Sequence, residues 1–144
     1  MSLELPITWL EDDIWTRVRI GSQYLPTGEF QMVPTFLFNR FGHKEPKVYK
    51  ATATLSKTRD GALSTAPLVR YALKYPDLGR ELLIWFEEAF PYSILKWQEI
   101  YRDGFGDSPK ILITEGVKNK SIMIDYWSRN GVADSIYRGQ LGLE

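Results

Sequence analysis

The hydrophobic pattern changes its period in the middle of the chain, at residues 58–67 with the sequence TRDGALSTAP. Before this segment apolar and polar residues alternate, which is the period of a half-buried β-strand. After it, apolar residues recur three and four positions apart, which is the period of an amphipathic helix. The change predicts a chain that forms strands first and helices second, and therefore a mixed fold.

The first part of the chain predicts three strands, at residues 13–20, 30–41 and 47–57. The first, DIWTRVRI, alternates strictly, and the third does so with Tyr49, Ala51, Ala53 and Leu55 on one side. Pro34 has no amide hydrogen to donate to a neighbouring strand, so the second strand is expected at an edge or with a bulge. Three such strands in succession predict an antiparallel meander.

The middle of the chain predicts two or three helices, separated by prolines that end them. The first is expected from Ser64 or Thr65 to Pro76, the second over residues 77–90, and the third from Ser93 to Gly104. Beyond them, residues 110–115 and 121–127 alternate again and predict a hairpin, followed by a loop with a short helical tail.

These elements together predict an α+β fold in one domain, residues 1–144. The expected sheet is antiparallel, with an N-terminal three-strand meander, a C-terminal hairpin and the helices packed on one face. No apolar run approaches the length of a membrane span, and the N-terminus lacks the pattern of a signal peptide. We therefore expect no membrane association and a cytoplasmic location. The final Leu143 and Glu144 resemble a cloning remnant, so no function is assigned to them.

Several chemistries are excluded by composition. The chain has no cysteine, so it can form no disulfide, thiolate metal site or iron–sulfur site. Its one histidine, His43, falls in a turn and is expected to be an exposed turn residue. The acidic segments 11–13 (EDD) and 103–107 (DGFGD) lack the ligand spacing of an EF-hand, and are expected to be a solvated acidic turn and a helix end. We predict no cofactor and no metal.

Charge is uneven along the chain although the net charge is zero. Residues 14–74 hold ten lysines and arginines against three acids. In the segment FLFNRFGHKEPKVYK, at 36–50, alternation assigns Phe36 and Phe38 to a buried face, whereas Phe41 falls past the end of the strand. A basic, ring-bearing face for single-stranded nucleic acid is therefore predicted on the other side of the sheet, at Trp15, Arg17, Arg19, Lys50 and Lys57.

Aromatic residues are abundant, with five Trp, eight Tyr and seven Phe. In the segment 78–101, expected to be helical, apolar residues fall on more than one side of each helix, and such surplus surface marks contact sites. The leading hypothesis is a non-enzymatic interaction or assembly subunit that self-associates or docks a protein partner. The alternative is a nucleic-acid-binding domain, and the third possibility is a metal-dependent hydrolase. The residues predicted to bind a partner are Leu83, Ile84, Trp85, Leu95 and Trp97.

Overall fold

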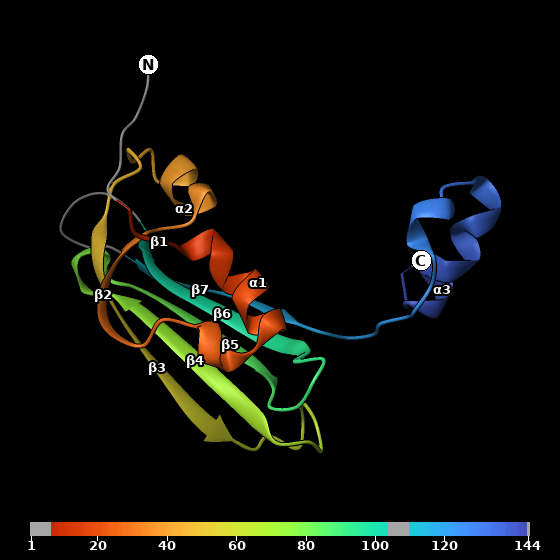
Figure 1. The fold of residues 1–144 in the computed structure, drawn as a ribbon. Helices are drawn as coiled ribbons and strands as arrows, with labels where there is room; N and C mark the ends of the chain where they lie inside the picture. Colours follow the sequence, from red (N-terminus) through yellow and green to blue (C-terminus); the bar gives the residue numbers. More distant parts are fainter. Residues whose placement is uncertain (1–6, 104–109, 144) are drawn as a thin grey trace.

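A seven-stranded sheet, whose strands lie in the order in which they occur along the chain, dominates the computed structural model, which describes residues 7–103 and 110–143 (Figure 1). Neighbouring strands are antiparallel except β1 and β2, which are parallel. The strands are β1 (Trp9–Leu10), β2 (Gly28–Val33), β3 (Tyr49–Thr58), β4 (Leu68–Tyr75), β5 (Arg80–Glu87), β6 (Ile94–Asp103) and β7 (Lys110–Val117).

The helices are short, and two of them lie on one face of the sheet: α1 (Ile14–Ile20) and α2 (Phe36–Phe41) (Figure 1). The third, α3 (Ile136–Gln140), lies near the C-terminus. Single turns of 3₁₀-helix occur at Glu11–Asp13, Ser22–Tyr24, Pro76–Leu78, Tyr126–Ser128 and Val132–Ser135. The protein is therefore α+β, as expected, and its sheet is mostly antiparallel.

The core lies between α1 and the face of the sheet that it covers, which we call the covered face. Ile14 and Val18 are four residues apart, so both point from α1 toward the sheet, where they are fully buried. They meet alternate residues of the central strands, such as Leu73 of β4 and Ile84 of β5. Because side chains alternate along a strand, Leu83 and Trp85 of β5 lie on the opposite, uncovered face.

Residues 13–20, expected to be a strand, form the 3₁₀ turn and helix α1 instead. Three acids precede this helix, and Arg17 and Arg19 lie in its last turn, so the charges suit the helix dipole. A seven-residue segment with apolar residues at positions 14, 18 and 20 satisfies both periods, and packing against the sheet decides between them. Residues 30–41, expected to be one strand, divide at Pro34 into β2 and α2.

The two or three helices expected in the middle of the chain are wrong, because β4, β5 and β6 occupy most of residues 64–103. Leu68, Tyr71, Ala72 and Tyr75 recur at helical spacing, yet all four are buried in β4, a central strand with apolar residues on both faces. Such a strand carries a nearly continuous apolar run, and periodicity alone does not separate that run from a helix.

Of the two strands expected to form a C-terminal hairpin, only the first is present. Residues 110–115 lie in β7, which pairs with β6, whereas residues 121–127 contribute no strand. Residues 118–143 leave the sheet at the end of β7 and stand apart from it as a group of short helices, shown in blue in Figure 1. No helix formed by the described residues is long and apolar enough to span a bilayer.

Candidate functional site

A cavity of about 670 Å³ opens on the covered face, between helices α1 and α2 and strands β5 to β7. We call it the groove. The two short helices leave the outer part of the sheet open: α1 reaches β6 through the contact of Trp15 with Trp97, whereas most residues of β7 are exposed. Aromatic and aliphatic side chains from both helices and from β6 provide its apolar walls: Trp15, Leu37, Phe38, Phe41, Trp97 and Tyr101.

Trp97 of β6 lies at the centre of the contact between helix and sheet. Its ring meets that of Trp15 edge to face, with the ring centroids 6.3 Å apart. On the other side, Trp97 lies over Gly116 of β7, its partner in the sheet. A Cβ at Gly116 would come within 2.3 Å of the indole Nε1, so the indole occupies the space that glycine leaves.

The outer wall of the groove exposes large apolar side chains to solvent. Phe41 is 78 % exposed and Leu37 is 60 % exposed, although both belong to a helix that packs on the sheet. Leu112 of β7 does not line the groove, but it is also exposed on the covered face, where it pairs with Tyr101 in the sheet. Apolar surface that is contiguous and uncovered is typical of a site that another molecule covers.

A buried ion pair forms the inner end of the groove. Arg80, the first residue of β5, donates to the two carboxylate oxygens of Glu11, with N–O distances of 2.5 and 2.7 Å. Both side chains are almost completely buried. The hydroxyl of Tyr75 donates to the same carboxylate at 2.8 Å, and the Nε of Arg80 donates to Glu99 at 2.6 Å. The pair therefore joins the segment before α1 to β4, β5 and β6.

The environment of this pair shifts the pKa values of Arg80 and Tyr75. Burial lowers the pKa of Arg80, but the hydrogen bonds and charges of Glu11 and Glu99 more than offset that effect and raise it above its ordinary value. Burial, followed by the nearby charge of Glu11, raises the pKa of Tyr75 far above that of a free tyrosine. Arg80 is therefore a cation and Tyr75 a neutral donor, an arrangement that stabilises the fold and offers no group ready to exchange a proton.

The other acids of the EDD segment are also structural. Asp12 accepts hydrogen bonds from the hydroxyl of Thr35, at 2.5 Å, and from the backbone N–H of Phe36, at 3.2 Å, at the start of α2. Asp13, the last residue of the 3₁₀ turn before α1, lies 3.7 Å from Arg17. Glu11 is thus not part of a solvated turn, as had been expected, because its carboxylate is the buried partner of Arg80.

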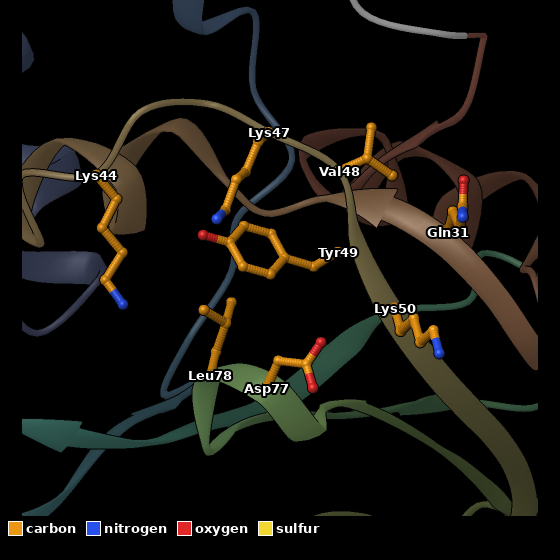
Figure 2. A pocket seen from close by; sticks show the side chains of 8 residues that line it. All are labelled: Gln31, Lys44, Lys47, Val48, Tyr49, Lys50, Asp77 and Leu78. Atoms are coloured by element: carbon orange, nitrogen blue, oxygen red, sulfur yellow. The ribbon is translucent and has the colours of Figure 1, made fainter.

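A second hollow, of about 560 Å³, adjoins the groove and shares Lys44 and Leu78 with it. Figure 2 shows Lys47 reaching the ring of Tyr49, with Asp77 and Leu78 on the opposite side of that ring and Lys44 at the side of the hollow, where its ammonium lies 5.2 Å from the centre of the Phe38 ring. The ammonium of Lys47 lies 5.0 Å from the centre of that ring. We call this hollow the lysine pocket; its remaining lining residues are Gln31, Val48 and Lys50.

The five residues predicted to bind a partner do not share one surface. They lie on the antiparallel strands β5 and β6, so alternation sends neighbours to opposite faces. Trp97 points into the groove, whereas Leu83 and Trp85 lie on the uncovered face. Ile84 is fully buried in the core, and Leu95 lies at the register shift between β5 and β6.

The five residues predicted to bind nucleic acid are also dispersed. Trp15, Arg17 and Arg19 lie on α1, and Arg17 is held by the ring of Trp9 at 4.6 Å. Lys50 and Lys57 are seven residues apart on β3, which places them about 23 Å apart and on opposite faces. Lys57 also pairs with Glu88. Trp15 instead contacts Trp97, which was predicted to bind a protein partner.

The remaining candidates add no catalytic cluster in the described part of the chain. His43 is exposed in the turn after α2, as expected. Within residues 7–103 and 110–143, no group of three or more acidic or histidine side chains is placed to hold a metal ion. Most of the DGFGD segment, at 104–107, lies outside the described residues.

Sequence reasoning missed Leu37 and Phe41, which belong to the exposed wall of the groove. It read this segment as a strand whose buried face holds Phe36 and Phe38, and it placed Phe41 past the strand end and gave it no role. The ion pair was missed because Glu11 and Arg80 are 69 positions apart. Comparison with known families, curated proteins and solved structures gives no match for this chain.

Proposed function

We propose that this chain is an interaction or assembly subunit that self-associates or docks a protein partner through the groove. The observation that supports it is the uncovered apolar wall made by Leu37 and Phe41 beside the tryptophan pair of Trp15 and Trp97. Aromatic side chains gathered in a preformed hollow are typical of the energetic centres of protein interfaces.

The energetics favour a binding role for this surface. Covering a large apolar side chain contributes about 1.5–3 kcal/mol, so a few such side chains supply a substantial part of a micromolar interaction, about 8 kcal/mol. The Glu11–Arg80 pair and the Asp12 cap hold α1 and α2 in position before any partner arrives. A wall that is already ordered loses little entropy on binding, which increases affinity.

Size-exclusion chromatography with light scattering tests this proposal on the full chain and on two matched variants. Phe41→Glu places a charge in the groove wall, and we expect it to weaken self-association or partner binding by at least about tenfold, or 1.4 kcal/mol. Phe36→Glu is the control, because Phe36 lies on the same helix and is 60 % exposed but does not line the groove. Equal behaviour of the two variants would contradict the proposal, as would a wild-type monomer that retains no partner.

A second candidate function, binding of single-stranded nucleic acid, is supported by the lysine pocket. Three lysines line this hollow and one of them, Lys47, lies over the ring of Tyr49, so the hollow combines positive charge with an aromatic ring, as sites that bind single strands do. The same chromatography at low and high salt separates the two functions. Nucleic acid that co-elutes at low salt and is lost at high salt would favour this candidate, because phosphate contacts weaken as salt rises.

A further inference from the structure

We propose that the occupant of the groove is the C-terminal tail, residues 118–143, of a second copy of this chain. The inference rests on the proposed function and names the partner of the same site. It begins from the position of the tail, which leaves the sheet at the end of β7 and turns away from it (Figure 1). The tail thus does not cover the groove of its own chain.

The tail has local structure of its own. Its two 3₁₀ turns and α3 are held by internal bonds, such as that from the Nε of Arg129 to Asp125, at 2.9 Å. The backbone N–H of Gly131 donates to Asp134, also at 2.9 Å. Arg129 in addition lies over the ring of Tyr137. A segment with this much internal bonding can dock as a preformed unit.

The apolar side chains of the tail are turned outward. Met123 is 99 % exposed and Val132 is 94 % exposed, and Tyr126, Trp127 and Ile136 are also largely exposed. A short helical segment gains nothing in water from presenting five such side chains, since burial of apolar surface is what stabilises helices of this length. The tail therefore carries an apolar surface that its own chain leaves exposed.

The chemistry of the groove suits these side chains. Its walls are aromatic, and exposed Lys44 and Arg102 line its rim. Cations at a rim favour the faces of aromatic rings, which Tyr126 and Trp127 would bring. Residues 118–125 contain no helix or strand and can span up to about 27 Å, which is enough to reach a neighbouring molecule.

Reciprocal exchange of tails closes a two-fold dimer. Each copy then provides one groove and one tail, so both uncovered surfaces are satisfied by the same symmetry operation. The two aromatic and three aliphatic side chains of each tail, with the groove surface they cover, would bury on the order of 2,000 Å² in the dimer. That area is the size of a stable, specific interface, about 1,200–2,000 Å² or more.

Cysteine cross-linking tests the exchange directly, because the native chain has no cysteine. A copy with Thr114→Cys, in the groove, is mixed with a differently tagged copy with Ala133→Cys, in the tail, and a short bis-maleimide is added. We expect a cross-linked species that contains one copy of each. Thr54→Cys is the matched control on the uncovered side of β3 and should give no such species with Ala133→Cys.

A second measurement uses full-length variants of the tail. We expect Trp127→Glu to weaken dimerisation at least about tenfold, as Phe41→Glu does, and Ser121→Glu to leave it unchanged. Dimerisation sensitive to Phe41→Glu but not to Trp127→Glu would overturn the tail assignment while the proposed function stood. A cross-link within one monomeric chain carrying both cysteines would also overturn it. Dimerisation insensitive to both charges, for instance through the edge of β7, would contradict both proposals.

Discussion

The three acids at positions 11–13 are adjacent in sequence but have three different roles. Glu11 is the buried partner of Arg80, Asp12 binds the start of α2, and Asp13 forms a partly exposed pair with Arg17. A run of acids usually indicates a solvated turn, and the sequence contains no local signal that one of them is buried. Only the fold brings Arg80 to Glu11, because β5 passes under the segment that leads into α1.

The buried pair makes a strong prediction for stability. Glu11→Ala removes one partner and leaves Arg80 buried with Glu99 alone, so we expect the free energy of unfolding to fall by about 3–5 kcal/mol. Asp13→Ala is the control, because its ion pair with Arg17 is partly exposed and contributes less than about 1 kcal/mol. Urea unfolding of the two variants measures the difference, and similar midpoints would show that the Glu11 pair does not hold the fold together.

At the scale of elements, the sequence predicted β3, which has one mainly polar face and one mainly apolar face. It misread β5, which carries apolar residues on both faces. Strand β3 was expected at 47–57 and is found at 49–58, since its threonines and lysines mark one side clearly. In β5, Leu83 and Trp85 lie opposite Leu82 and Ile84, so apolar residues occur on both faces and the alternation was hidden.

The candidate site was partly predictable for the same reason. Trp15 and Trp97 were each selected as exposed aromatic residues, but for different functions and on different surfaces. Their contact depends on α1 being a helix that crosses β6, which the alternation of residues 13–20 did not indicate. Sequence reasoning thus selected two aromatic residues that line the groove, but it did not predict that α1 and β6 bring them together.

Packing of β6 against β7 predicts the effect of one added methyl group. Gly116→Ala should displace the indole of Trp97, because the new Cβ would lie 2.3 Å from Nε1, and overpacking of this kind costs about 1–3 kcal/mol. We expect a lower unfolding midpoint and a shifted indole N–H resonance for Trp97. Gly61→Ala is the control, since a Cβ there meets no atom within 4 Å. An unmoved Trp97 resonance in the Gly116 variant would mean that the indole does not pack on β7.

At the scale of the whole molecule, protection from solvent decreases across the sheet. Strands β4 and β5 carry buried residues along their length, β6 is only partly buried, and most residues of β7 are exposed. The predicted α+β class is a statement about the whole molecule, as is the prediction of a single domain. The class is right although several elements were misassigned, because the errors exchanged helices for strands in both directions.

This gradient predicts the pattern of amide hydrogen exchange. In dilute Trp127→Glu protein we expect the amides of β4 and β5 to exchange slowest, since they open only when the core unfolds, and those of β7 to exchange fastest among the strands. In concentrated wild-type protein the amides of β7 should become more protected, because a tail docked as proposed would lie over Thr114, which lines the groove. Exchange in β7 as slow as in β4 in the dilute variant would contradict the gradient. Protection of β7 that is independent of concentration in the wild type would show that this side of the sheet stays uncovered.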